Sequence, residues 1–552
     1  MKIERRETDV LCVGGGITGL MAAVSARKEG AKVLIVEKGN ASHSGAGRIG
    51  CDHFGGYFPD VHGPDMEAYI DYMLNAPMAG INAVLSRDAI RANFSRTMEV
   101  VNMWESWGIP MKYKGKYTPG GHGIPGMKLI HVHYQGRGQK PILHKKALES
   151  GAEIMNRVMI FELLGGPSGI TGAIGIDTRE DRLVEFQAKT VVLGTGLAMR
   201  VYPNITPGLL GNELHPPTCT GDGLSMAYRL GAELVSVEKT MHWVGLKNFA
   251  RPGKGTWVGV YKDAKGNVIG SFVTKPQRHF GDSTPDMDPL LFYRLRKDGV
   301  GPVYLDGNGM TDEDIEYLRY WLTHEGNVSV LNHMDEEGID HRKSPLEFVT
   351  YGLTPGGKLS VNERAETTVK GMYAAGDELS VGIGWAATFG YVAGENAARY
   401  AKSAPMPDIS KEKAKLEQKR LLVEQIQSRT SGTDWRDANV ALQNTMQDYA
   451  GMVRWQEMLE AGLNHLRRLK VKASSQIRAG NRWELTRCLE VLNMYELGEL
   501  ILQANLEVKD KRGLHPRIDC AITDPRIGNK SLFVRKVDDK PEFEWRMIKH
   551  SR

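Results

Sequence analysis

The spacing of glycines near the amino terminus constrains this chain more than any other feature. Gly14, Gly16 and Gly19 follow an apolar run and precede an Ala-rich helical segment, and a second apolar run then ends on Glu37. This context predicts a dinucleotide-binding βαβ unit. Gly14 would make the tight turn, Gly16 would let a pyrophosphate approach, and Gly19 would let the helix pack on the sheet. The helix N-terminus would offer N–H groups to the phosphates, and Glu37 would accept hydrogen bonds from the ribose.

Two later glycine loops point to a cofactor longer than a nicotinamide dinucleotide. One is Gly194-Thr195-Gly196, which follows the apolar run at 188–193, and the other is Gly376-Asp377, which follows a short apolar run. Both ends of the chain would then touch one cofactor, and FAD fits that requirement. The helix that contains Trp385 begins in small residues, so its N-terminus can approach a flat ring and stabilise negative charge there. Asp222 opens another helix, in a Thr-Gly-Asp-Gly segment.

Composition and charge exclude several classes of protein. The 552 residues are too many for one core, so two to four domains are expected. The net charge of +5 is spread along the chain without a Lys/Arg block, which argues against a nucleic-acid partner. The charge could suit an acidic partner protein or an anionic substrate, but ordinary solvated surface charge explains it better. No apolar run reaches 18 residues, so no membrane span is predicted.

The five cysteines show no Cys-x-x-Cys spacing. Neither a disulfide framework nor an iron–sulfur or other metal site carried by this chain alone is therefore expected. The first ten residues lack the apolar core of a signal peptide, and we expect a cytoplasmic protein. His131 and His133 alternate on a possible strand, and we interpret them as structural, because two ligands do not make a metal site.

The pattern of elements divides the chain into four segments. Residues 1–245 carry the βαβ unit and a meander with strands at 161–164, 172–177 and 183–186, followed by a separate strand at 188–196. Residues 246–346 lack the alternation of strands and helices and are interpreted as an inserted domain. Residues 347–404 are again predicted to form strands and helices. Residues 405–552 are predicted to be helical, with helices at 411–429, 438–469 and 481–503. The last forty residues show no regular pattern.

Six segments together resemble a known family: residues 14–37, 42–47, 220–233, 296–306, 373–377 and 512–519. They are similar to the flavoprotein subunits of succinate dehydrogenase and fumarate reductase, and to their relatives L-aspartate oxidase and the adenylylsulfate reductase alpha subunit. Residues 299–306 are most similar to the adenylylsulfate reductase branch. The resemblance implies an α/β fold in which a Rossmann-like FAD-binding domain is split by an α+β capping domain and followed by a C-terminal helical domain. It also implies an iron–sulfur, ferredoxin-like partner subunit.

The same resemblance implies site residues. His242 and Arg251 are similar to catalytic positions of fumarate reductases, and His333 and Arg294 are further candidates in the inserted segment. A histidine and an arginine that bind dicarboxylate in those enzymes have no counterpart at residues 350–357 and 381–390. A dicarboxylate is therefore not implied, and we expect a small anionic substrate of another kind.

The remaining cofactor contacts are Lys38, His43, Ser44, Gly45 and Trp385. The Ser42-His43-Ser44 segment is similar to the one through which succinate dehydrogenases attach FAD covalently, but an alignment on the later glycines places Ser44 in that position. The alternatives are a covalent bond to His43 and a non-covalent flavin with His43 near its ring. The side chain of Trp385 would either line the cofactor pocket or pack in the hydrophobic core.

These patterns predict a catalytic flavoprotein subunit that exchanges a hydride or electron pair between FAD and a small substrate. An alternative is a flavin electron-transfer subunit whose partner protein performs the substrate chemistry. A nucleotide-sensing or RNA-modifying flavoprotein is disfavoured, because no basic patch is present.

Overall fold

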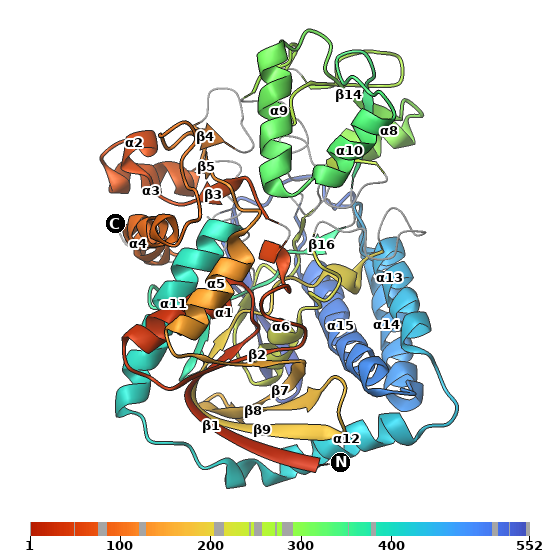
Figure 1. Ribbon diagram of the computed structural model, residues 1–552. Coiled ribbons are helices and arrows are strands. Elements are labelled where there is room, and N and C mark those ends of the chain that lie inside the picture. Colours follow the sequence, from red (N-terminus) through yellow and green to blue (C-terminus); the bar gives the residue numbers. More distant parts are fainter. Residues whose placement is uncertain are drawn as a thin grey trace.

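The computed structural model describes residues 2–48, 50–75, 85–120, 128–203, 215–241, 244–247, 257–270, 273–278, 291–350, 353–376, 382–510, 517–528 and 530–547. A seven-stranded sheet lies at the centre of the molecule (Figure 1). Its order is β6-β2-β1-β9-β8-β7, with β18 also paired to β9. The strands are β1 (Lys2–Val13), β2 (Val33–Glu37), β6 (Glu153–Asn156), β7 (Val158–Gly166), β8 (Gly169–Asp177), β9 (Arg182–Leu193) and β18 (Met372–Ala374).

Strand β9 joins the parallel and antiparallel parts of this sheet. The sequence predicts two strands here, but the structure has one, because apolar residues are buried along almost the whole of β9. It runs parallel to β1 along its length. On its other edge it pairs antiparallel with β8 in its first half and parallel with β18 at its end. The meander therefore shares a strand with the parallel sheet, and β9 delivers Gly194 beside the end of β1.

Helices α1 (Ile17–Lys28) and α11 (Ile383–Ser403) pack together against this sheet, with α5 (Gln139–Glu149) beside α1 (Figure 1). Their backbones approach closely at two glycines of α11. A Cβ on Gly390 would lie 2.9 Å from Thr18 O, and one on Gly394 would overlap Ala22 O. The contact brings the first turns of both helices to the same edge of the sheet. Helices α2 (Pro59–His62), α3 (Met66–Asn75), α4 (Arg87–Ser106) and α6 (Asp222–Arg229) complete this part.

A smaller sheet of order β12-β15-β14-β13 forms the cap, with its own apolar core. Its helices lie above the central sheet in Figure 1. Its first and last strands are neighbours, with Leu246 opposite Phe348. Both connections to the rest of the chain therefore leave from adjacent strands. The elements are β12 (Val244–Leu246), β13 (Val260–Lys262), α8 (Leu291–Lys297), β14 (Val303–Asp306), α9 (Asp312–Glu325), α10 (Val328–Glu336) and β15 (Leu346–Thr350).

The C-terminal part consists of four long helices, α12 (Lys413–Ser428), α13 (Trp435–Tyr449), α14 (Gln456–Gln476) and α15 (Arg482–Glu507). The predicted single helix over 438–469 is wrong, because the chain turns between α13 and α14. Arg454 is fully buried at that turn and its Nε donates to Ala450 O at 3.2 Å and Gly451 O at 2.8 Å. These bonds satisfy carbonyls beyond the end of α13.

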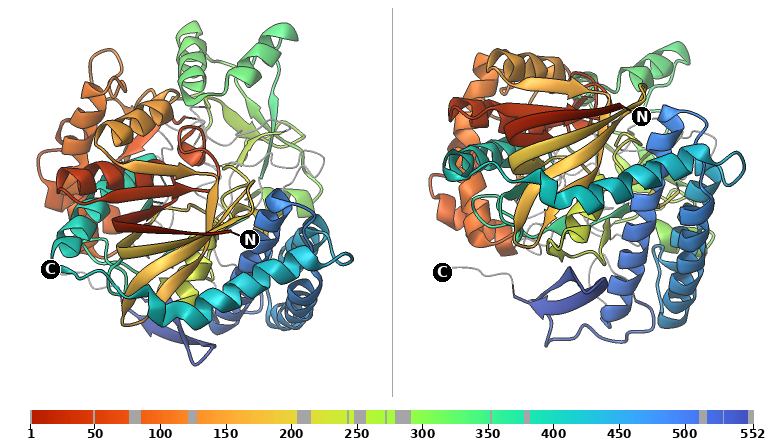
Figure 2. Two further views of the ribbon diagram at one scale, coloured as in Figure 1. Left: turned by 60° about the horizontal axis from the view of Figure 1, so that its bottom comes forward. Right: turned by 90° about the horizontal axis from the view of Figure 1, so that it is seen from below.

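The expectation that the last forty residues are irregular is also wrong. Strands β19 (Ser531–Val537) and β20 (Lys540–Arg546) form a hairpin, seen at the lower edge of both views in Figure 2. Asp538 and Asp539 make the two-residue turn with φ of +46° and +60°. This turn type usually contains glycine or asparagine, so the sequence gives a weak hairpin pattern. Strand β19 also pairs with β10 (Leu234–Val235), which pairs with β17 (Lys358–Leu359).

Within the described residues, no helix is both long enough and apolar enough to cross a membrane.

Replacing Gly394 by alanine tests the close packing of α1 and α11. The added methyl group overlaps Ala22 O, so the helices must separate, and overpacking of this kind costs about 1–3 kcal/mol of stability. We expect the thermal unfolding midpoint to fall by several degrees. Gly138→Ala is the control, because a Cβ there meets no atom within 4 Å. Equal midpoints for the two variants would contradict the packing described.

Candidate functional site

The glycine loops singled out in the sequence meet at one pocket at the edge of the central sheet. The pocket holds about 1020 Å³, which includes space open to solvent. Nine of the expected cofactor-binding residues line it: Gly14, Gly16, Glu37, Lys38, Gly45, Gly194, Thr195, Gly196 and Asp222.

Glycines from separate loops pack closely around Thr18, in the first turn of α1, at the floor of this pocket. A Cβ on Gly194 would lie 3.0 Å from Thr18 Cβ, and one on Gly376 would overlap Thr18 Oγ1. A Cβ on Gly14 would overlap Gly194 O, and Gly14 has a φ of +99°, which favours glycine. The three loops thus converge although they lie far apart in the sequence.

The N-terminus of α1 opens into the pocket. Gly16 is the N-cap residue and its first-turn N–H groups have no side-chain cap. A Cβ on Gly16 would meet only Gly194 O, at 3.6 Å, so the protein leaves space above this helix end. Uncapped N–H groups and the helix dipole make such a site suitable for a phosphate.

Glu37 lies at the end of β2, with its carboxylate held by two backbone donors. Gly15 N donates to Oε2 and Gly39 N donates to Oε1, each at 2.7 Å. Each oxygen retains a lone pair for a further donor such as a ribose hydroxyl. Nearby, Ser44 Oγ is buried and has no hydrogen-bond partner within the described part of the chain. The Glu37 carboxylate and the uncapped N-terminus of α1 fit an adenine dinucleotide such as FAD.

Lys38 forms a buried charge cluster instead of pointing at open space. Its Nζ donates to Thr220 Oγ1 at 3.0 Å, Asp222 Oδ2 at 2.8 Å and Glu490 Oε1 at 2.9 Å. Despite burial, the paired carboxylates raise the pKa of Lys38, and Lys38 lowers the pKa of Asp222. Glu490 also pairs with Arg200 and Arg487. The cluster therefore joins β2, α6 and the C-terminal helix α15.

Lys140 lies under the phosphate-binding turn, a position that the sequence pattern did not reveal. It is fully buried on α5 and its Nζ donates to Gly15 O. Burial lowers the pKa of Lys140 to about 8, although the carboxylate of Glu37 acts in the opposite direction. A cation beside a pyrophosphate site would stabilise the bound phosphates.

Other expected site residues lie elsewhere. His43 is exposed, with its Nδ1 2.5 Å from Ser42 Oγ, and neither His43 nor Ser44 lines the pocket. Trp385 is 4% exposed and packs near Phe94 and Phe389, outside the pocket lining. Three expected residues fall outside the described residues: Asp377, His242 and Arg251.

Arg294 on α8 and His333 on α10 are exposed on the cap. Neither lines the pocket, so the structure does not bring these two catalytic candidates to it.

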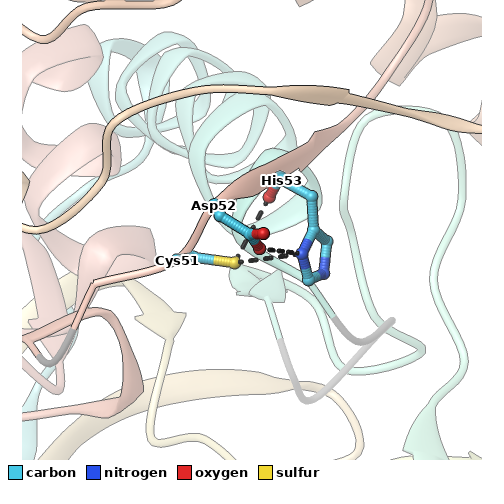
Figure 3. A group of neighbouring side chains, drawn as sticks. All are labelled: Cys51, Asp52 and His53. Atoms are coloured by element: carbon cyan, nitrogen blue, oxygen red, sulfur yellow. Dashed lines mark hydrogen bonds and ion pairs between the residues drawn. The ribbon is translucent and has the colours of Figure 1, made fainter. Parts of the chain in front are cut away.

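A Cys-Asp-His run that the sequence interpretation missed lies beside the pocket. Cys51, Asp52 and His53 directly follow Gly50, which is a lining residue (Figure 3). Position 50 also touches the cap, because a Cβ there would lie 2.6 Å from Glu325 O at the end of α9.

Comparison with known proteins finds two domain families in this chain. The FAD binding domain family matches residues 9–258, and the family described as fumarate reductase flavoprotein C-term matches residues 439–552. A fumarate reductase (CoM/CoB) subunit of Methanothermobacter marburgensis is 24% identical, over 98% of this chain and 100% of its own length. The Escherichia coli fumarate reductase flavoprotein subunit is 22% identical, over 98% of this chain and 94% of its own.

This chain contains an FAD binding domain and the C-terminal domain of fumarate reductase flavoproteins, and its relatives include fumarate reductase and adenylylsulfate reductase subunits. It is an FAD-dependent oxidoreductase, and the resemblance, the fold class and the cofactor expected from the sequence are confirmed. Solved structures share the fold of this flavoprotein. Adenylylsulfate reductase from Archaeoglobus fulgidus has a TM-score of 0.84 at 22% identity and covers 100% of this chain and 98% of its own. E. coli quinol fumarate reductase has a TM-score of 0.81 at 19% identity and covers 99% and 98%.

Gly16→Val tests the phosphate site separately from the fold. A Cβ at position 16 meets only Gly194 O, at 3.6 Å, and the methyl groups of valine would fill the space above the α1 N-terminus. We expect folded protein that retains less than a tenth of the FAD of the wild type, measured by absorbance after gel filtration. Gly166→Val is the control, with no atom within 4 Å of its Cβ. A fully loaded Gly16→Val protein would refute this site.

Lys38→Met tests the buried charge cluster. Removing the cation leaves Asp222 and Glu490 less well paired, and breaking a buried pair from one side costs about 3 kcal/mol. We expect a lower thermal midpoint for the variant. The lowered pKa of Asp222 contributes stability above its unfolded pKa that is lost as pH falls through the folded value. The loss of stability of Lys38→Met relative to the wild type should therefore be constant between pH 6 and 9 and become smaller below about pH 4. A pH-independent deficit would argue against an ionic cluster.

Proposed function

We propose that this flavoprotein is a catalytic subunit that reduces or oxidises a small anionic substrate between its FAD-binding domain and its cap. The observation that carries the proposal is the contact of cap helix α9 with the pocket edge at Gly50. A cap seated there would exclude water from a substrate at that end of the pocket. We also propose the domain boundaries 1–245, 246–346, 347–404 and 405–552 expected from the sequence.

The lining residues support one orientation of the cofactor. Glu37 and the β7 residues Val158 and Ile160 would receive the adenosine, and the α1 N-terminus would receive the pyrophosphate. The ring would then lie toward Gly50 and the first turn of α11, where Gly382, Ile383 and Ala386 line the pocket. The N-terminus of α11 would stabilise negative charge on the ring. FAD, when bound, supplies hydride or electron-pair transfer.

We propose non-covalent attachment, because His43 is exposed and lies outside the pocket lining. The electron partner is proposed to be a separate iron–sulfur, ferredoxin-like subunit, since the cysteines of this chain lack the spacing that holds a cluster. A cytoplasmic location stays a prediction.

Reoxidation of the reduced protein tests the catalytic role. Protein reduced by dithionite would be mixed with fumarate, other unsaturated carboxylates and adenylylsulfate, and flavin absorbance followed by stopped flow. We expect at least one of these anions to reoxidise the flavin directly, and a two-cluster ferredoxin to reduce it again. Reoxidation only through an added iron–sulfur protein, with no anion reacting, would support the alternative in which the partner performs the substrate chemistry.

A further inference from the structure

Lys140 carries a positive charge that is buried beside the phosphate-binding turn. The residue is 0% exposed, and its Nζ donates to Gly15 O. An ammonium group has three N–H donors, and Gly15 O is the acceptor that the described part of the chain provides for them. Among the described residues, no carboxylate forms an ion pair with Lys140. Because burying a charge with so few partners is costly, an anion bound nearby would stabilise this group.

The start of helix α5 contacts two loops of the pocket. Gln139 and Lys140 are the first two residues of this helix. Gln139 Nε2 donates to Gly47 O at 2.9 Å, and Lys140 donates to the carbonyl of Gly15 in the turn before α1. Gly47 lines the pocket, and so does Gly16, which follows Gly15. Lys140 does not line the pocket itself, so its effect on a bound cofactor would pass through the turn.

Gly15 is held on both sides by groups of opposite charge. Its N–H donates to Glu37 Oε2 at 2.7 Å, and its carbonyl accepts from Lys140. In a trans peptide, the carbonyl and the following N–H point to opposite sides. The Gly16 N–H therefore points away from Lys140, and Gly16 is a lining residue of the pocket. A charged donor on the carbonyl also polarises the peptide, which makes this N–H a stronger donor.

The pocket needs a positive charge that its lining lysine does not supply. Lys38 is already paired with Asp222 Oδ2 at 2.8 Å and with Glu490 Oε1 at 2.9 Å. Glu37 brings negative charge to the lining, and the pyrophosphate of FAD would bring more. Lys140 lies close enough to this charge for the carboxylate of Glu37 to favour its protonated form.

We propose that Lys140 is a positioning residue for the pyrophosphate of FAD, acting through the Gly15 carbonyl to orient the Gly16 N–H toward the pocket. Its ammonium group also supplies positive charge beside the phosphates. The inference rests on the proposed orientation of the cofactor, with its pyrophosphate at the α1 N-terminus, and not on the proposed catalytic activity.

This role makes FAD binding depend on pH. Burial lowers the pKa of Lys140 to about 8 in the protein without a ligand. A bound pyrophosphate would stabilise the ammonium group and raise this pKa. By linkage, FAD would then bind most tightly below pH 8 and more weakly as the pH rises above that value.

Other charged groups near Lys140 do not produce the same pH dependence. They are Glu37 on β2, His144 on α5 itself, Arg27 on α1 and Arg48 of the turn η1 (Ala46–Arg48). Carboxylates and arginines keep their charge between pH 7.5 and 9.5. Burial and the charge of Lys140 lower the pKa of His144, so its ring is neutral throughout this range.

The first test measures the pH dependence of FAD release from the wild-type holoprotein. FAD-loaded protein is diluted in steps at pH 7.5, 8.5 and 9.5, and the fluorescence of released FAD gives a dissociation constant at each pH. We expect this constant to rise at least fivefold between pH 7.5 and 9.5, because the unloaded protein loses the Lys140 proton in this range. A smaller rise would overturn the role of Lys140.

The second test removes the charge. We expect Lys140→Met to bind FAD about tenfold more weakly than the wild type at pH 7.5, because a charge-assisted hydrogen bond to the turn is lost. Its dissociation constant should change less than twofold up to pH 9.5, so the difference between the two proteins becomes smaller at high pH. Wild-type affinity at pH 7.5, or an affinity lower by the same factor at every pH, would overturn the proposal.

Lys145→Met is the matched control for this substitution. Lys145 lies on the same helix, but its side chain is 75% exposed. We expect this variant to keep both the affinity and the pH dependence of the wild type. Lys140→Gln, which retains an uncharged donor, is the second variant if Lys140→Met does not fold, and it should also lose the pH dependence.

The outcomes for the cofactor orientation and for Lys140 are distinguishable. If Gly16→Val keeps its full FAD content, the phosphate site fails, and the role of Lys140 fails with it. If Gly16→Val loses FAD but release from the wild type does not depend on pH, the phosphate site stands and the role of Lys140 alone is refuted. Both tests measure FAD binding without a substrate, so a failure of the catalytic proposal leaves their results unchanged.

Discussion

The structure depends on glycines that approach closely around the first turn of α1. Thr18 lies in contact with Gly194 from β9, Gly376 after β18 and Gly390 of α11. A side chain at any of the three glycine positions would hold the loops apart. The phosphate-binding surface would then be distorted even in the absence of a ligand. The shape of the cofactor pocket thus depends on glycines, which have no side chains. The charged groups around the pocket come from other segments of the chain.

That second layer consists of buried ion pairs between segments far apart in the sequence. Lys38 joins Asp222 and Glu490, and Glu162 on β7 joins Arg229 of α6 and Lys419 of α12. Buried pairs add little net stability compared with apolar packing, but breaking one is costly. Their effect here is to fix how the C-terminal helices sit against the FAD-binding sheet.

The sequence predicted the fold class and the three glycine loops because these features follow from local rules of turn and helix. Gly14, Gly194 and Gly376 each carry their own strand context, and nothing distant is needed to recognise them. The break between α13 and α14 could not be predicted, because Arg454 is satisfied there partly by Glu238 O and Thr240 Oγ1 from the other end of the fold. Lys140 could not be predicted as a site residue for a similar reason, since its position under the phosphate-binding turn depends on its contact with Gly15, far away in the sequence. For Trp385 the sequence left open whether the side chain lines the pocket or packs in the core, and the structure shows that it packs in the core.

The C-terminal hairpin has a consequence for how the chain is made. Strand β19 completes a sheet begun by β10, almost three hundred residues earlier, and Glu490 reaches Lys38 across a still longer stretch. During synthesis the nascent polypeptide can form the β1–β2 unit early, but the edge of β10 stays unpaired until β19 has been synthesised. Such long-range closure slows folding and leaves an unpaired edge exposed in the meantime. Truncation before β19 would therefore leave the edge of β10 unpaired, although the lost strand lies outside the cofactor pocket.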